Sequence, residues 1–213
     1  MKGLLMNHVF ITEKTIRNYG LLAIVIVVAL YLSGHSLALR GAGFVPFLFL
    51  IQPAFEVLKH DALSGWHKFV ITLPIKRATY VQSHYLLCLI LIGSAAIISL
   101  GLFLLAQLLI DFDTILTFYL FFFRGMGIVL IIAALVYPLT FKLGIENLTQ
   151  SSSLAVLVRL DSSSQAQSYF LYFTSSSNDS VDLIFSLIFL VISFILFLLS
   201  CLISSYIFNQ KEY

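Results

Sequence analysis

Charged residues are scarce in this sequence. Asp, Glu, Lys and Arg make up 10% of its 213 residues, whereas a soluble domain carries about 25%. Apolar residues make up 60%. This composition excludes a disordered chain, a coiled-coil rod and an ordinary cytosolic enzyme. It favours an integral membrane protein.

Cysteine is almost absent as well. The two cysteines, Cys88 and Cys201, lie within apolar runs, where a thiol packs as a small apolar side chain. We therefore expect neither a disulfide scaffold nor a redox site. The net charge of +2 gives no reason to expect nucleic acid as a partner. Spanning helices use most of the chain, so residues 1–213 are predicted to form a single transmembrane domain.

Long apolar runs dominate what is present. A spanning helix needs about 20 predominantly apolar residues. The runs cover residues 21–39, 44–58, 85–110, 115–141, 154–173 and 181–208. The run at 154–173 is the weakest because it contains Arg159, Asp161 and several serines, and a charge at the centre of a span is costly. The predicted fold is all-α, with six transmembrane helices.

The distribution of basic residues predicts the orientation, because cytoplasmic loops carry an excess of Lys and Arg. Nine basic residues fall before the first run, in alternate connections, or after the last run, and the opposite side holds only Arg40. Both termini are therefore expected in the cytoplasm, which requires an even number of crossings and favours a spanning fifth run. The nine are Lys2, Lys14, Arg17, Lys59, Lys68, Lys76, Arg77, Lys142 and Lys211.

Two short segments on the cytoplasmic side resemble amphipathic helices. In residues 1–19, most apolar side chains fall on one half of a helical wheel and most polar ones on the other, which predicts an interfacial helix. In residues 59–79, Asp61 is a candidate N-cap. Trp66, Phe69, Val70 and Leu73 then follow the spacing of one helix face until Pro74 ends the helix. A helix that anchors the chain to the membrane surface is the alternative for this second segment.

Several chemical motifs are missing. The sequence has no G-x-x-x-x-G-K-[ST] phosphate loop. Any use of ATP, with its Mg²⁺, would therefore require a partner chain that binds the nucleotide. The five histidines show no spacing typical of metal ligands. No serine nucleophile motif and no adjacent glutamates occur in the spans. We expect no catalytic residue, no metal and no cofactor in this chain, which is therefore not predicted to be an enzyme.

Ionisable residues at membrane depth usually face the bundle interior or a wet cavity and find a partner. Arg124 lies in the fourth run and Asp161 in the fifth, and we predict an ion pair between them. In the alternative, Arg124 extends toward the outer interface. The polar side chains of the two runs form a speculative substrate path, consisting of Arg124, Arg159, Asp161, Ser163 and Gln167.

Residues 61–77 resemble the cytoplasmic segment between the second and third spans of ABC-2 type transporter permeases. That segment reads D-x-x-S-G-W-x-x-[FY] and then T-L-P-[IV]-x-R. The matching positions are Asp61, Ser64, Gly65, Trp66, Phe69, Thr72, Leu73, Pro74 and Arg77. The similarity is closest to the small permeases that export phenol-soluble modulins and other amphipathic peptides.

The resemblance implies that the 59–79 segment contains a coupling helix, which docks on a separately encoded ATPase. It also implies a second permease subunit, identical or paralogous, and a bacterial cell membrane as the location. The implied docking surface consists of the matching positions together with Lys68. The implied cargo is hydrophobic or amphipathic, most simply a peptide that reaches the permease from membrane lipid or from the cytoplasm.

Two other classes remain open at this stage. A non-energised immunity or binding protein for a membrane-active peptide would need no ATPase, and its cytoplasmic helix would contact only lipid. A secondary transporter or channel would favour helices broken by Gly and Pro in corresponding halves. Pro46, Pro53 and Pro138 do not form such a repeat.

Overall fold

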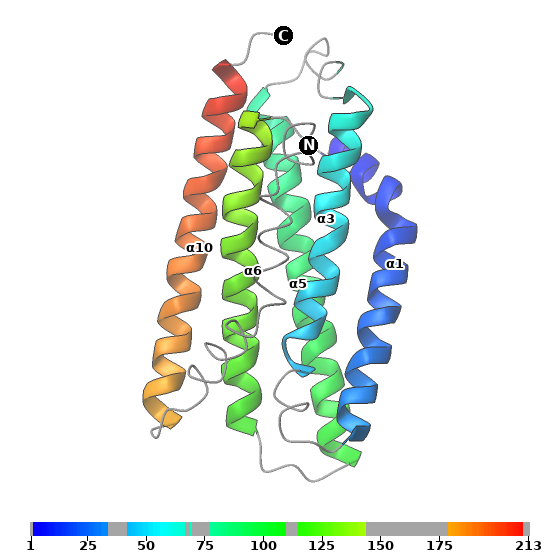
Figure 1. The fold of residues 1–213 in the computed structure, drawn as a ribbon, viewed down its shortest axis with the longest axis vertical. Helices are drawn as coiled ribbons and strands as arrows, with labels where there is room; N and C mark the ends of the chain where they lie inside the picture. The colour runs from blue at the N-terminus through cyan, green and yellow to red at the C-terminus, as the bar shows by residue number, and fades with distance from the viewer. Residues whose placement is uncertain are drawn as a thin grey trace.

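Five long helices make up the part of the chain that the computed structural model describes, which is residues 2–33, 42–66, 69, 77–109, 115–143 and 179–210. No strand occurs in these residues, so the all-helical prediction is confirmed for them. Figure 1 shows the helices side by side in an elongated bundle. They are α1 (Lys2–Ser33), α3 (Val45–Leu63), α5 (Arg77–Leu109), α6 (Ile115–Leu143) and α10 (Asp179–Gln210).

The helices do not simply alternate in direction. In Figure 1, α1 and α5 run downward, while α3, α6 and α10 run upward. The start of α1 and the end of α10 therefore lie at the same end of the bundle. Because α6 and α10 are parallel, the chain leaves α6 at the upper end and enters α10 at the lower end.

Four of the described helices are long and apolar enough to cross a membrane, namely Gly3–Ser33, Arg77–Leu108, Phe118–Lys142 and Asp182–Gln210. They coincide with four of the predicted apolar runs. The run at 44–58 corresponds to α3, which is shorter at 19 residues and carries Glu56, Lys59 and Asp61. The run at 154–173 lies outside the described residues. The chain is a multi-pass membrane protein.

Close helix packing holds the bundle together, while the outward faces stay apolar. On α10, Ile188, Ile195 and Leu202 are about half exposed or more, as expected for side chains that face lipid. Polar bridges link the inward faces: the Tyr85 hydroxyl in α5 lies 2.7 Å from the hydroxyls of both Ser200 and Ser204 in α10. Such bridges satisfy polar groups that the bilayer cannot hydrate.

The interfacial helix was predicted over residues 1–19; of these, residues 2–19 belong to α1, which continues to Ser33. Its first turns run at an angle to the rest in Figure 1. Thr12 Oγ1 donates to the His8 carbonyl at 2.7 Å, a backbone contact of the kind that bends helices. His8 and Thr12 are buried, whereas Met6 and Phe10 are exposed. An interfacial position for these turns stays a prediction.

Candidate functional site

The end of α3 leads into the segment predicted to couple the chain to an ATPase. The Ser64 N–H donates to the His60 carbonyl at 2.9 Å, which continues the helical hydrogen bonding beyond Leu63. Gly65 then has a φ of 68°, the left-handed conformation that commonly ends a helix and that glycine adopts without steric cost. Gly65 therefore sets the direction in which the chain leaves α3.

We expect Gly65→Ala to lower the free energy of unfolding by about 1 kcal/mol, because a Cβ is strained at a positive φ. Among the described residues beyond its chain neighbours, no atom lies within 4 Å of the added Cβ, so the expected effect comes from backbone strain. The midpoint of thermal unfolding in detergent measures the effect. Gly3→Ala is the matched control, since Gly3 also has open space around its Cβ position and no positive φ. Equal midpoints for the two variants would contradict this account.

Two aromatic side chains follow this turn. The rings of Trp66 and Phe69 lie 5.3 Å apart, centroid to centroid. Trp66 packs against the edge of the core, whereas Phe69 is 53% exposed. Both residues have helical backbone conformation, and the Phe69 N–H donates to the Gly65 carbonyl at 3.4 Å. This places one apolar ring on the surface beside a second that is anchored in the protein.

The sequence pattern predicted that Asp61 caps the start of a helix. It does not, because α3 continues through Asp61 to Leu63. Its side chain is 2% exposed, so it is not part of the outer surface. The Tyr80 hydroxyl donates to Asp61 Oδ2 at 3.0 Å. Burial acts to raise the pKa of this carboxyl, but the imidazoles of His84 and His8 and the hydrogen bond from Tyr80 outweigh it, and the pKa is lowered.

The other predicted docking residues are divided between described and undescribed parts of the chain. Ser64 is exposed, and Arg77 begins α5, where its Nη1 donates to the Asn209 carbonyl near the end of α10 at 3.1 Å. The structure thus joins the start of α5 to the end of α10. Lys68, Thr72, Leu73 and Pro74 lie outside the described residues.

Arg124, the first residue of the predicted substrate path, is buried between α6 and α10. Its Nη2 lies 3.6 Å from Asp182 Oδ1, and its Nε donates to Ser186 Oγ at 2.9 Å. A buried arginine within a candidate span thus has a carboxylate partner, and the partner here is Asp182. Arg159, Asp161, Ser163 and Gln167 lie outside the described residues, so their contribution and the pair with Asp161 stay predictions.

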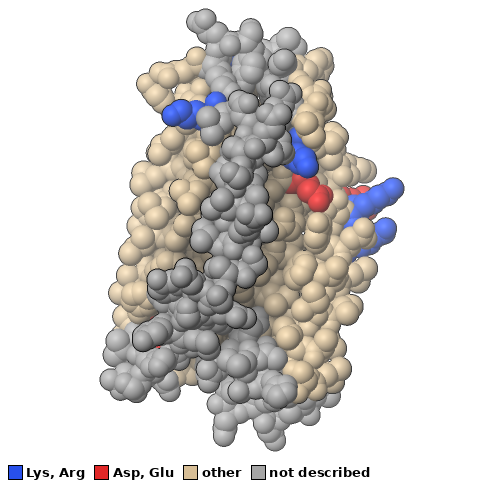
Figure 2. All heavy atoms as spheres, viewed as in Figure 1, with Lys and Arg blue, Asp and Glu red and all other residues tan. Residues whose placement is uncertain are grey.

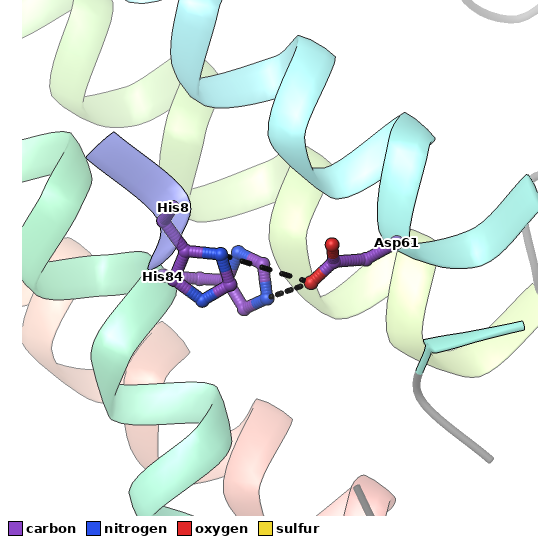
Figure 3. Close-up of side chains that lie close together, drawn as sticks. All are labelled: His8, Asp61 and His84. Atoms are coloured by element: carbon purple, nitrogen blue, oxygen red, sulfur yellow. Dashed lines mark ion pairs between the residues drawn. The ribbon is translucent and has the colours of Figure 1, made fainter. Parts of the chain in front are cut away.

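Sequence reasoning missed that Asp61 lies with two histidines, His8 of α1 and His84 of α5 (Figure 3). The three residues are far apart in the sequence, so no motif joins them. A partial signal was available within single helices: His8 and Thr12, like Tyr80 and His84, are four residues apart and share a helix face.

The fold and these sites define a multi-pass helical membrane protein with buried polar groups between its helices. The chain belongs to the ABC-2 family: the model described as "ABC-2 family transporter protein" matches residues 3–209. Comparisons with curated proteins and with solved structures gave no match. The family resemblance inferred from residues 61–77 is therefore confirmed, and it points to an ABC ATPase partner in general. The narrower group of amphipathic-peptide exporters stays a prediction.

Proposed function

We propose that this chain is the permease subunit of an ATP-driven exporter. A separate ATPase subunit would bind and hydrolyse ATP with Mg²⁺, and two permease subunits would surround a path for a hydrophobic or amphipathic substrate, in the simplest case a peptide. The observation that carries the proposal is the family match over residues 3–209. On this proposal the chain itself performs no catalysis and works in a bacterial cell membrane.

The charge distribution supports cytoplasmic termini. Figure 2 shows that the Lys and Arg side chains visible on this face lie in its upper half, toward the end where α1 begins and α10 ends. An excess of basic residues marks the cytoplasmic side. The parallel direction of α6 and α10 supports a further crossing between them, because the chain joins opposite ends of the bundle. Together these observations favour six spans.

The geometry after Leu63 supports a mechanical connection to the ATPase. α3 ends in a turn fixed by Gly65, and Trp66, which is packed on the core, is in ring contact with the exposed Phe69. A force applied to such a segment would reach α3 and α5 as packed rigid elements. Partly buried aromatic residues are also frequent anchors of protein interfaces.

The test uses the full chain purified with candidate phosphate-loop ATPases from the same organism, beginning with any that an adjacent reading frame encodes. We expect Trp66→Ala to reduce ATPase copurification or the hydrolysis stimulated by candidate amphipathic peptides by about tenfold or more, the effect typical of an interface anchor. Membrane insertion should be unchanged.

Phe10→Ala is the matched control, since Phe10 is an exposed aromatic residue on α1 (67%) and lies outside the 59–79 segment that carries the predicted docking surface. It should leave both measurements at the wild-type level. Wild-type coupling in Trp66→Ala would refute the docking assignment. Failure of the wild-type chain to bind any such ATPase would refute the permease proposal itself and favour a non-energised binding protein.

A further inference from the structure

Three side chains from three helices converge near the end of the bundle where the chain begins. They are His8 of α1, Asp61 of α3 and His84 of α5 (Figure 3). His84 Nε2 lies 3.3 Å from Asp61 Oδ2, and His8 Nδ1 lies 3.9 Å from the same oxygen. One nitrogen or oxygen of each residue lies within 4.8 Å of the others. The three candidate ligand atoms therefore lie around a common point.

The two imidazoles are buried without full hydrogen bonding. His8 and His84 are 0% exposed. Among the described residues, His8 Nδ1 and His84 Nδ1 have no hydrogen-bond partner, and the polar atom beside His84 Nε2 is Asp61 Oδ2 at 3.3 Å. Aromatic rings line the surroundings, including Phe141 at 6.1 Å from the His84 ring, centroid to centroid. A buried polar atom without a partner is destabilising, so something that accepts nitrogen lone pairs would stabilise the cluster.

The surrounding hydrogen bonds determine which ring nitrogen of a neutral His8 carries the proton and which carries the free lone pair. Ser83 Oγ donates to the Tyr80 carbonyl at 2.6 Å, so it is left to accept from His8 Nε2, which lies 3.2 Å away. The proton of a neutral His8 then resides on Nε2, and the bare Nδ1 faces Asp61 Oδ2. Two electron-rich atoms facing each other inside a protein repel unless a proton or a metal cation lies between them. Histidine ligands of metals are commonly held in this way, through the other ring nitrogen.

We propose that His8, Asp61 and His84 bind one divalent transition-metal ion, with Zn²⁺ as the reference. Metal–ligand bonds to His and Asp of about 2.0–2.2 Å in a tetrahedral site separate the ligand atoms by roughly 3.3–3.6 Å. The two distances to Asp61 Oδ2, 3.3 and 3.9 Å, are close to this range. All three ligand atoms lie within 4.8 Å of one another, so binding would draw the side chains slightly closer together. Imidazole with carboxylate suits zinc and its neighbours, whereas Mg²⁺ and Ca²⁺ prefer sites made of oxygen alone. A solvent molecule or Asp61 Oδ1 would complete the coordination.

Bound metal would join three helices at one point. His8 belongs to the angled first turns of α1, Asp61 to the last turn of α3, and His84 to the third turn of α5. The ion would hold the start of α1 against the two helices that flank the candidate coupling segment. The joining of the three helices by the ion depends only on the three ligands and not on which substrate the protein carries.

The test uses the full chain, purified in detergent, stripped with a chelator and then given ZnCl₂ or CoCl₂. We expect one zinc ion per chain by elemental analysis and a midpoint of thermal unfolding that rises with zinc until it saturates. Co²⁺ in the site should show the visible absorption of a low-coordinate complex. His8→Gln and His84→Gln should each weaken zinc binding by more than about tenfold.

His60→Gln is the matched control. His60 is a neighbour of Asp61, but its side chain is 57% exposed, and it should bind zinc as the wild type does. Ser83→Ala provides a variant that keeps all three ligands and removes the partner of His8 Nε2, so it should weaken zinc binding less than His8→Gln does. Unchanged zinc affinity in His8→Gln and His84→Gln would mean an adventitious ion only. That result, or a wild-type chain that gives no low-coordinate Co²⁺ spectrum, would overturn the proposal.

Discussion

Replacing Arg124 with glutamine is expected to lower the free energy of unfolding by about 3–5 kcal/mol, the range measured when one partner of a buried ion pair is removed. The side chains of Arg124 and Asp182 are 10% and 17% exposed, so water screens their charges poorly. The variant leaves the Asp182 carboxylate near the start of α10 without its arginine partner. The midpoint of thermal unfolding and the yield of monodisperse protein in detergent measure the loss.

A double-mutant cycle tests whether the two residues act as a pair. Asp182→Asn alone should also destabilise the protein, and the variant with both changes should lose less than the two single losses combined. Ser186→Ala is a useful control, because it removes the hydroxyl that accepts from Arg124 Nε at 2.9 Å and leaves the ion pair in place. It should cost about 1 kcal/mol, the usual contribution of a hydrogen bond. Additive losses for Arg124 and Asp182 would exclude the pair as the cause.

The sequence pattern was sufficient to locate most of the helices. A run of apolar residues long enough to span a bilayer has few alternatives, because the backbone must satisfy its own hydrogen bonds there. The runs at 85–110, 115–141 and 181–208 correspond closely to α5, α6 and α10. The ends were predicted less well. α5 begins at Arg77, and α1 reaches back to Lys2, because polar residues outside the apolar run continue the same helix.

Contacts between helices could not be derived from the pattern in the same way. Arg124 was expected to find a partner, but which one depends on how α6 and α10 lie against each other, and Ser186 is 62 residues away in the sequence. The same holds for Asp61, whose pattern resembles an N-cap and whose actual environment is set by His8 and His84. Periodicity shows which residues share a face, but not which faces meet.

Gly127→Leu is expected to destabilise the protein by about 1–3 kcal/mol, as overpacking of a tightly packed interior does. A Cβ at this buried position in α6 would lie 2.6 Å from the Phe189 ring and 3.2 Å from Ser193 Oγ, both in α10. The absence of a side chain therefore allows α6 and α10 to approach closely, as small residues do in other membrane helices. The midpoint of thermal unfolding measures the change.

Gly101 of α5 provides the matched control for Gly127, because it is exposed and a Cβ added there would meet no atom of the described part of the chain within 4 Å. Gly101→Leu should be neutral or stabilising, since glycine is a poor helix former by about 1 kcal/mol. If close contact with Phe189 is the cause, Phe189→Ala should recover part of the stability lost in Gly127→Leu by making room for the new side chain. Equal effects at positions 101 and 127, or no recovery with Phe189→Ala, would show that this contact does not limit the approach of the two helices.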